Sequence, residues 1–438
     1  MAAIREWWQR ATKCVGVRRG EVTVASAAAP NSGHSSAAER WQCRLLRIAP
    51  LLLAASVLIR FAASVLQYGD LYIDLRVYVV GGAAVGRPGT LYDAFSLDGV
   101  GQHLPFTYPP FAAILYYPLH WFPFAIVAFA WTAATIAALY GVVRISQMMA
   151  GSDNPRAAML WTGAAILFEP VRSTLDLGQV NMFLMLAVLY AARSSRWWVS
   201  GSLVGLAAGV KLTPAIASFY LLGMRRWTAA AASIVAFVAT IGVSAVLLPR
   251  ETRLYFTELL GDVQRVGAVD YAPNQSWQGT LSRIVGYDVG RGPLLLLAIF
   301  ATAILAAFAW RALGGRFQIR DALGSLLVIQ LFGLTISPVS WTHHWVWVVP
   351  LVVWLFHGRW CDAPGVKVLR WLWVALLLIG VPTLLALQPQ DYSRPWYFAW
   401  ADAVYVPMTL ATFAWMIVAG RQGAKQDGDR RAIRAGER

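Results

Sequence analysis

Long apolar runs, separated by short polar stretches, recur along most of the chain. They lie near residues 48–66, 109–119, 122–145, 157–168, 179–192, 199–211, 213–223, 227–248, 292–312, 322–337, 344–356, 368–386 and 398–419. A helix needs about 20 apolar residues to cross the hydrocarbon core of a bilayer, and the longer runs reach that length. Open sheets cannot span lipid, and these runs are too unbroken for barrel strands. The pattern therefore predicts an all-α polytopic membrane protein.

Composition and charge placement agree with that class. The 438 residues are 58% hydrophobic and 13% charged, with a formal net charge of +15. Basic residues cluster before the first run and after the last, as the positive-inside rule expects of two cytoplasmic tails. We therefore expect a disordered N-terminal tail over 1–44, a transmembrane catalytic domain over 45–420 and a basic tail over 421–438. The excess of basic residues has no need of a nucleic-acid partner.

Two cytoplasmic ends require an even number of spans. The short 109–119 segment, which begins in consecutive prolines, is the best candidate for a re-entrant or interfacial piece, and this leaves about 12 spans. With that choice the basic loops fall on the cytoplasmic side. Five polar motifs, together with the 67–107 loop, then fall on the outer side: FTYPP, FEPVRSTLDLGQVN, GVKLTP, NQSWQG and SPVSWTHHW. Polar residues at membrane ends are costly unless they serve a site or pathway.

Several kinds of site are disfavoured. Cys14, Cys43 and Cys361 are scattered, so they indicate neither a disulfide framework nor a metal site. The chain has no GxxxxGKS phosphate loop, no HExxH and no Rossmann fingerprint after a strand. We expect no cofactor and no metal ion.

Asp74 has two interpretations. It directly precedes the apolar stretch 75–85, where an aspartate is a favoured helix N-cap. It is also placed to act as a carboxylate general base, which would take the proton from an attacking hydroxyl. Asp70, in more polar sequence, is expected to be a solvated charge.

His343 and His344 are adjacent, so their side chains on a helix would point about 100° apart and could not easily share a metal ion. One interpretation makes them interfacial residues in a belt of tryptophans. The other makes one of them a hydrogen-bond partner for a phosphate or a carboxylate. The sequence does not choose between the two histidines.

Lys211 interrupts an apolar run between a glycine and a proline. Its side chain could snorkel to the membrane surface. Alternatively it supplies a cation for an anionic lipid head, with Arg172 as a bidentate phosphate partner and Glu169 holding that arginine in place. Four amide side chains on the same predicted side suit sugar hydroxyls: Gln179, Asn181, Asn274 and Gln275.

The motif blocks together resemble a known family. YIDLRVYVVGGAA, LPFTYPPFAAILYYPLH, EPVRSTLDLGQVN, GLAAGVKLTPA, NQSWQG and SPVSWTHHWVW occur in this order. The chain from about residue 45 to 420 is similar to the actinobacterial polyprenol-phosphate-mannose-dependent α-(1→2)-mannosyltransferases of the GT-C superfamily, and within them to mycobacterial enzymes that elongate phosphatidylinositol mannosides.

The resemblance implies a GT-C fold in the plasma membrane with a periplasmic active site. It implies polyprenyl-phosphate mannose as donor and a phosphatidylinositol mannoside as acceptor, with the tetramannoside becoming the pentamannoside. It assigns the essential aspartate of the first outer loop to Asp74, and an assisting histidine to His343 or His344. Tyr108 of the FTYPP block joins the candidate substrate-binding residues.

A β-linked donor and an α-linked product imply one in-line displacement with inversion at the sugar. Other functions stay open. One is a mannosyltransferase that branches lipomannan or lipoarabinomannan. A lipid or solute transporter would also place charges within a membrane, and an O-antigen-ligase-like enzyme would transfer a whole glycan from a lipid.

Overall fold

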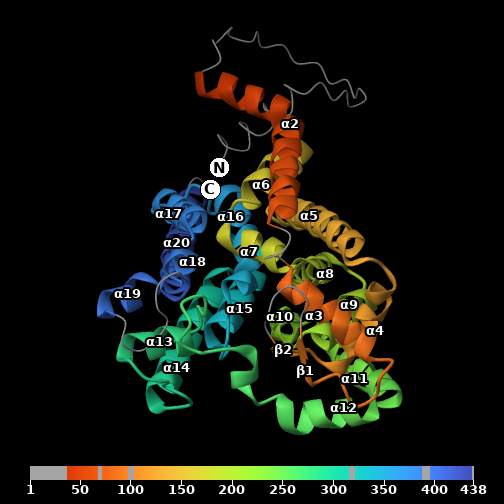
Figure 1. The fold of residues 1–438 in the computed structure, drawn as a ribbon. Helices are drawn as coiled ribbons and strands as arrows, with labels where there is room; N and C mark the ends of the chain where they lie inside the picture. Colours follow the sequence, from red (N-terminus) through yellow and green to blue (C-terminus); the bar gives the residue numbers. More distant parts are fainter. Residues whose placement is uncertain (1–36, 68–71, 97–102, 315–320, 387–394, 437–438) are drawn as a thin grey trace.

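The computed structural model describes residues 37–67, 72–96, 103–314, 321–386 and 395–436 (Figure 1). The predicted N-terminal tail up to residue 36 and Asp70 lie outside these ranges. At the other end, the C-terminal helix α20 (Tyr405–Gly436) continues from the apolar region through the basic segment. Cys43 in the first described helix is disulfide-bonded, which the sequence did not predict, whereas Cys361 is a free thiol.

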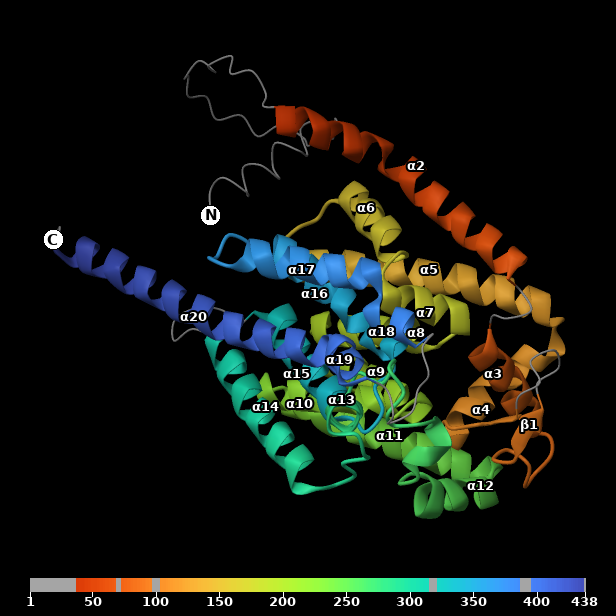
Figure 2. The same ribbon diagram turned by 60° about the vertical axis from the view of Figure 1, so that its left-hand side comes forward.

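The membrane character of the chain is evident in its longest helices. Five described stretches are long and apolar enough to cross a bilayer. They belong to α2 (Ala37–Leu66), α5 (Phe124–Met149), α11 (Trp227–Leu247), α14 (Pro293–Ala312) and the consecutive helices α17 (Val366–Ile379) and α18 (Val381–Leu385). Both views place α2 and α14 at the edges of the molecule, in agreement with their exposed apolar side chains (Figures 1 and 2). The total of about 12 spans stays a prediction.

Shorter helices fill the space between the long ones. Those of the interior are α6 (Pro155–Ala165), α7 (Glu169–Leu177), α8 (Asn181–Arg193), α9 (Trp197–Val210), α10 (Ala217–Gly223), α15 (Ala322–Ile336) and α16 (Val348–His357). Four more belong to the polar loops: α3 (Ile73–Ala84), α4 (Pro110–Tyr116), α12 (Pro249–Leu254) and α13 (Trp277–Val285). A last short helix, α19 (Trp396–Ala401), precedes α20.

Helical turns of other types connect these elements. They are η1 (Tyr117–Trp121), η2 (Thr213–Ile216), η3 (Tyr255–Leu259), η4 (Val263–Val266) and η5 (Thr342–Trp347). The expected all-α class has one exception in the described residues, a small antiparallel pair of strands. β1 (Ala94–Ser96) and β2 (His103–Pro105) pair with Phe95 opposite Leu104.

Glycines allow α9 to lie directly against α11. Gly201, Gly205 and Gly209 recur every four residues, so they form one stripe along α9. A Cβ at Gly205 would lie 2.3 Å from the backbone oxygen of Ser233, and one at Gly209 would lie 2.5 Å from Oγ1 of Thr240. Only glycine permits this approach, which is typical of helix pairs in membranes. The contact holds the end of α9, and hence Lys211, in a defined place.

Two large groups of buried apolar side chains make up the interior. The larger includes Met182 and Trp345 and lies among α5, α8, α15, α16 and α20. The smaller includes Tyr78, Tyr108 and Val210 and lies among α3, α4 and the ends of α8 and α9. Polar side chains from the predicted outer motifs meet where these two groups adjoin.

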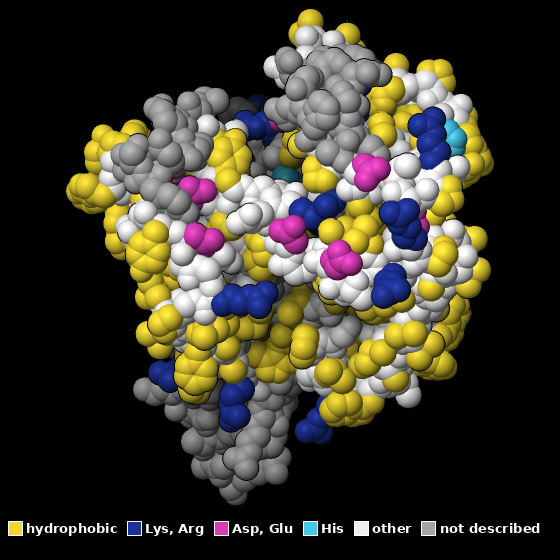
Figure 3. All heavy atoms as spheres, turned by 60° about the horizontal axis from the view of Figure 1, so that its bottom comes forward, with side chains coloured by type: hydrophobic (Ala, Val, Ile, Leu, Met, Phe, Trp, Pro, Cys, Tyr) yellow, Lys and Arg dark blue, Asp and Glu magenta, His cyan; other side chains and the backbone are white. Residues whose placement is uncertain are grey.

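The face at the bottom of Figure 1 carries charges of both signs. Figure 3 shows Lys, Arg, Asp and Glu side chains scattered across it, with hydrophobic side chains more abundant toward its margins. The loop elements β1, β2 and α12 lie at this end of the molecule (Figure 1).

Candidate active site

Lys211 follows the last residue of α9, where the helix must stop. Pro214 has no N–H to bond the carbonyl of Val210, so regular helix cannot continue through it. Lys211 adopts an extended conformation (φ −149°, ψ 131°) and its side chain leaves the helix axis. Lys211 is therefore the residue at which α9 ends, in agreement with the interruption seen in the sequence.

The ammonium group of Lys211 is enclosed by four polar side chains from three other segments. Its Nζ lies 2.9 Å from Oδ1 of Asn181 and 3.1 Å from Nε2 of His344. It lies 3.4 Å from both Oε1 of Gln179 and the hydroxyl of Tyr108. It also faces the Tyr108 ring, 5.2 Å from the centroid. Lys211 thus points into a polar cluster instead of snorkelling to the surface.

A glycine turn brings two of these amides together. Gly178 ends α7 with a left-handed conformation (φ 71°), which glycine adopts without strain. Gln179 and Asn181 follow at once, and Asn181 is the first residue of α8. Its Oδ1 accepts from Lys211, while its Nδ2 donates to the backbone oxygen of His343 at 2.8 Å. Both ends of this amide are held.

Asp74 lies in the first turn of α3 and does not cap it. The cap position belongs to Tyr72, and no side chain there makes a capping bond. Burial removes water from the Asp74 carboxylate and raises its pKa to about 6, although a hydrogen bond from Gln179 and the charge of Lys211 act in the opposite direction. Burial lowers the pKa of Lys211 to about 7, against the attraction of Asp74. Asp74 and Lys211 are therefore a carboxylate and an ammonium group that attract each other in one partly buried site.

Two tyrosines extend this network through Gln179. The hydroxyls of Tyr78 and Tyr108 lie 2.7 Å apart, and both donate to Oε1 of Gln179, at 3.1 and 3.0 Å. Sequence reasoning missed Tyr78. A signal existed, because Tyr78 lies four residues after Asp74 and so shares its face of α3.

The two histidines contribute different groups. The ring of His344 contacts Lys211, and His343 offers its backbone oxygen to Asn181 and, at 3.3 Å, to the hydroxyl of Thr174. The rings meet edge to face with centroids 4.6 Å apart. Burial and the nearby charge of Lys211 keep the pKa of both well below the ordinary histidine value, so both rings are neutral near pH 7.

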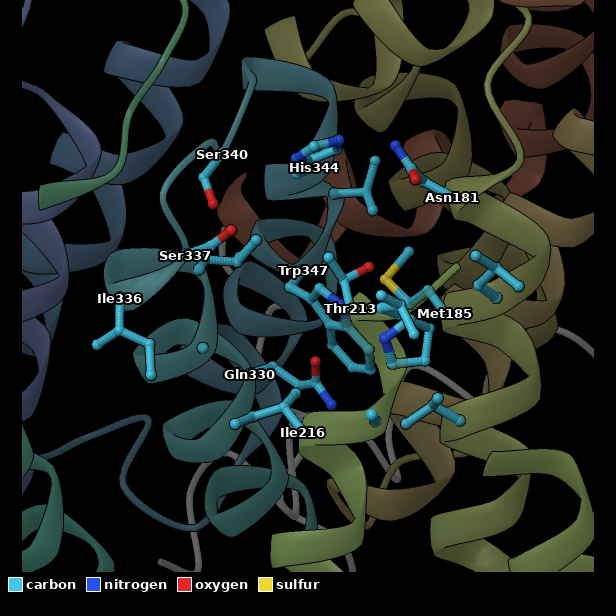
Figure 4. A pocket seen from close by; sticks show the side chains of 18 of the residues that line it. Asn181, Met185, Thr213, Ile216, Gln330, Ile336, Ser337, Ser340, His344 and Trp347 are labelled. Atoms are coloured by element: carbon cyan, nitrogen blue, oxygen red, sulfur yellow. The ribbon is translucent and has the colours of Figure 1, made fainter. Parts of the chain in front are cut away.

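Two cavities adjoin this Lys211 cluster, which we define as Asp74, Tyr78, Tyr108, Gln179, Asn181, Lys211 and His344. The first holds about 390 Å³, and Figure 4 shows His344 and Asn181 at one end of it and Gln330 and Ile216 toward the other. The second holds about 810 Å³ and is lined almost wholly by apolar side chains, among them Tyr116 and Val210. The ring of Tyr116 stacks on Tyr78 with centroids 4.5 Å apart. Both cavities fit hydrocarbon chains.

The structure does not join Glu169 and Arg172 to this cluster. The Glu169 carboxylate accepts hydrogen bonds from Thr383 and from the hydroxyl of Tyr405, so it ties α7 to α18 and α20. No ion pair links it to Arg172 in the described chain. A Cβ added to Gly380, at the junction of α17 and α18, would lie 3.1 Å from Nη2 of Arg172. The sequence led us to expect that Glu169 would hold Arg172 beside a bound phosphate. The structure instead gives Glu169 partners outside the cluster.

Asn274 and Gln275 form a second buried cluster, with Arg283 and Asp402. Asn274 bonds the backbone of Val269, Ser276, Pro338 and Ser340, and Gln275 bonds that of Ala272, Asp402, Val404 and Tyr405. Arg283 pairs with Asp402 at 2.8 Å. These amides were expected to meet sugar hydroxyls, but both are fully buried and the backbone occupies their donors and acceptors.

The Lys211 cluster can perform a definite kind of chemistry. A carboxylate with a raised pKa can accept a proton near neutral pH. An enclosed ammonium group can stabilise an anion that forms beside it. Within the described residues no three His, Cys, Asp or Glu side chains are grouped to hold a metal ion.

The chain is similar to proteins of one known family. The glycosyltransferase family 87 model matches residues 106–338. A Mycolicibacterium smegmatis protein named polyprenol-phosphate-mannose-dependent alpha-(1-2)-phosphatidylinositol pentamannoside mannosyltransferase is 54% identical, over 87% of this chain and 93% of that protein. A Mycobacterium tuberculosis protein of the same name is 53% identical, over 86% and 89%.

A third relative is more distant. A Mycobacterium tuberculosis polyprenol-phosphate-mannose-dependent alpha-(1-2)-phosphatidylinositol mannoside mannosyltransferase is 30% identical, over 80% of this chain and 84% of its own length. No solved structure matches the chain. The family match and the length of the aligned relatives show that this chain is a glycosyltransferase of family 87.

Proposed function

We propose that the protein transfers mannose from polyprenyl-phosphate mannose to the 2-hydroxyl of a phosphatidylinositol mannoside, at the periplasmic face of the plasma membrane. The observation that carries the proposal is the enclosed ammonium group of Lys211 near the partly buried carboxylate of Asp74. The relatives' names support this donor and acceptor class. The resemblance to the GT-C superfamily supports the fold and the orientation.

In the proposed reaction Asp74 accepts the proton of the acceptor hydroxyl as its oxygen attacks C1 of the donor mannose. The bond from C1 to the phosphate oxygen breaks, and polyprenyl phosphate leaves with the electron pair. The configuration at C1 inverts from β to α. A lipid phosphate leaves readily, so the reaction needs no general acid.

Lys211 would receive the phosphate, and His344 would hold its ammonium group in place. Lys211 supplies a charge, and one well-placed donor in a dry site is worth on the order of 3–4 kcal/mol in the transition state. Nε2 of His344 accepts from Nζ of Lys211 at 3.1 Å, so the ring orients the ammonium group toward that anion. Asn181 keeps the ammonium in place through its own bond to the backbone of His343.

The sugar would lie between the cation and the carboxylate. Gln179 and Tyr108 line that interval and can exchange hydrogen bonds with sugar hydroxyls. Both cavities beside the cluster are apolar enough for the hydrocarbon of a lipid substrate. A transporter would not need a base of raised pKa beside an enclosed cation.

Purified protein in detergent with synthetic polyprenyl-phosphate mannose tests the proposal. The acceptors are phosphatidylinositol tetramannoside and, separately, the pentamannoside, because the relatives' names leave open which of the two is extended. We expect an α-(1→2) product with the tetramannoside. Transfer to a lipomannan acceptor alone would replace the acceptor assignment, and no turnover of the donor with any acceptor would contradict the function.

Asp74→Asn tests the base, and Asp153→Asn is its matched control, because Asp153 is an exposed carboxylate paired with Arg144. General base catalysis contributes roughly 100-fold to 10,000-fold, so Asp74→Asn should lose at least that much of kcat while still binding donor. Normal turnover by Asp74→Asn would remove Asp74 from the mechanism.

A further inference from the structure

The residue that begins α3 has an unusual backbone conformation. Tyr72, two residues before Asp74, lies in the left-handed region with φ 68° and ψ 27°. Residues other than glycine rarely adopt it, and those that do are held there by their surroundings. Tyr72 is 2% exposed. The direction in which α3 starts, and therefore the position of Asp74, depends on what holds Tyr72.

Hydrogen bonds hold the backbone N–H, the backbone carbonyl and the side-chain hydroxyl of Tyr72. Its N–H donates to the backbone oxygen of Asp176 at 2.7 Å, and its own carbonyl accepts from Arg76 at 2.8 Å to open the helix. Its hydroxyl lies 2.9 Å from the hydroxyl of Thr132 on α5. The link to Asp176 ties the start of α3 to the last turn of α7.

The side chain of Asp176 is itself held by the membrane helix α2. Nη1 of Arg60 pairs with Oδ1 of Asp176, and Arg60 is 7% exposed although it lies within an apolar helix. Arginine in such a helix is costly unless it has a partner or a task. The pair spans α2 and α7, which are far apart in sequence.

The same segment of α7 approaches Asp74 in two further ways. A Cβ at Gly178 would lie 2.6 Å from Cβ of Leu75, so the two backbones are in close contact. Gln179, the next residue, donates to the Asp74 carboxylate. Residues 176–179 therefore set both the backbone and the side chain of the aspartate.

We propose that Arg60 and Asp176 are positioning residues for the transfer reaction: their ion pair fixes the end of α7, which holds Tyr72 in its left-handed conformation and so aims Asp74 at the acceptor hydroxyl. This inference rests on the proposed role of Asp74. Neither residue touches the reacting atoms. Their effect is on geometry, and a displacement of about 1 Å in a reacting group can cost roughly 100-fold in rate.

The test replaces the pair by leucines, in the double variant Arg60→Leu/Asp176→Leu. Arg60 is buried, whereas Asp176 is 32% exposed. Exchanging an ion pair that is at least partly buried for apolar residues of similar size is often neutral for folding, so a loss of activity would not simply reflect unfolding. We expect kcat to fall about 10-fold to 100-fold with an unchanged KM for the donor. The single variant Arg60→Lys keeps the charge, so its kcat should stay close to that of the wild type.

A matched control removes another ion pair. Arg144 pairs with Asp153, and Asp153 is 73% exposed. Arg144→Leu/Asp153→Leu should leave kcat unchanged. If the Arg60 and Asp176 double variant does not fold, Asp176→Asn keeps the backbone oxygen and side-chain size and should lower kcat in the same direction.

Amide hydrogen exchange gives a readout that needs no substrate. In the wild type the Tyr72 amide is bonded to α7, and we expect the peptide that contains Tyr72–Arg76 to exchange faster in the double variant than in the control. Unchanged exchange, or a kcat loss without faster exchange at this peptide, overturns the proposal. A wild type that transfers no mannose contradicts the proposed function, while exchange still decides whether the pair holds Tyr72.

Discussion

The Lys211 cluster and the Asn274–Gln275 cluster are both buried and polar, and the sequence marked amides of both as candidates for the site. Their hydrogen-bond partners differ. Asn274 and Gln275 bond to backbone groups of neighbouring loops and the start of α20. In the Lys211 cluster, polar side chains from α3, α8, η5 and the loops meet one another and an ammonium group.

This difference separates a cluster that supports the fold from one that is free to meet a ligand. Backbone N–H and C=O groups in a loop lack the hydrogen bonds of secondary structure, and an amide side chain can supply them. Such an amide stabilises the fold and has no donor or acceptor left for a ligand. Side chains that bond one another around a charge can exchange those bonds for bonds to a substrate. Four predictions test this contrast.

Among these four, the largest effect is expected at Lys211. Lys211→Ala removes the charge that would receive the phosphate and should raise the KM for the donor, or lower kcat/KM, roughly 100-fold. Donor-concentration series with a fixed acceptor measure this. Lys211→Arg, which keeps the charge with a different shape, serves as the comparison. Unchanged donor affinity in Lys211→Ala would mean that the ammonium group is only structural.

The two histidines should differ in importance. The ring of His344 contacts Lys211, whereas His343 supplies its backbone oxygen to Asn181. His344→Ala should therefore lower kcat/KM about 10-fold, the value of one hydrogen bond to a charged group. His343→Ala keeps the backbone oxygen and should lose less. An equal or larger loss in His343→Ala would reverse the assignment.

Activity should depend on pH through both members of the charged pair. The pKa of Asp74 is raised to about 6 and only its ionised form accepts a proton, so kcat/KM should fall about 10-fold per unit below pH 6. The pKa of Lys211 is lowered to about 7, and loss of its proton removes the attraction for phosphate, so kcat/KM should also fall above pH 7.

Two further measurements identify the group responsible for the fall in activity above pH 7, the basic limb of the pH profile. The donor phosphate favours protonated Lys211, so the basic limb should move to higher pH in kcat. Lys211→Arg should lose the basic limb, because arginine keeps its proton. A basic limb that persists in this variant belongs to another group.

The smallest effect on catalysis is expected at Gln275. Gln275→Ala removes the side-chain hydrogen bonds to the backbone of Ala272, Asp402, Val404 and Tyr405, although the Val404 N–H still donates to the Asp402 oxygen. We expect the free energy of unfolding to fall by about 3 kcal/mol, since a buried polar group that loses its partner costs about 1–3 kcal/mol. Thermal unfolding measures this, and kcat per folded molecule should stay within about twofold. Gln179→Ala should lower kcat and change the free energy of unfolding less. A loss of kcat in Gln275→Ala with unchanged stability would contradict the contrast between the two clusters.

The local pattern of the sequence was enough to predict the helices and several members of the site. Apolar runs give the long helices, because burial in lipid depends mainly on the length and composition of one segment. Asp74, Lys211 and Asn181 stood out because polar residues beside apolar runs are conspicuous. The Lys211 cluster brings them together, as the motif blocks had led us to expect.

Other features depended on contacts between distant segments. Asn274 and Asn181 look alike in sequence, and only the fold shows that one bonds loop backbone and the other bonds Lys211. Glu169 turned toward Tyr405, which lies 236 residues away in the chain. Hydrophobic pattern is a property of a single segment, whereas hydrogen-bond partners and backbone constraints such as that on Tyr72 come from neighbours in space. The sequence by itself therefore determined the helical membrane class and the candidate residues, and the tertiary structure decided which of those residues lie together in the Lys211 cluster.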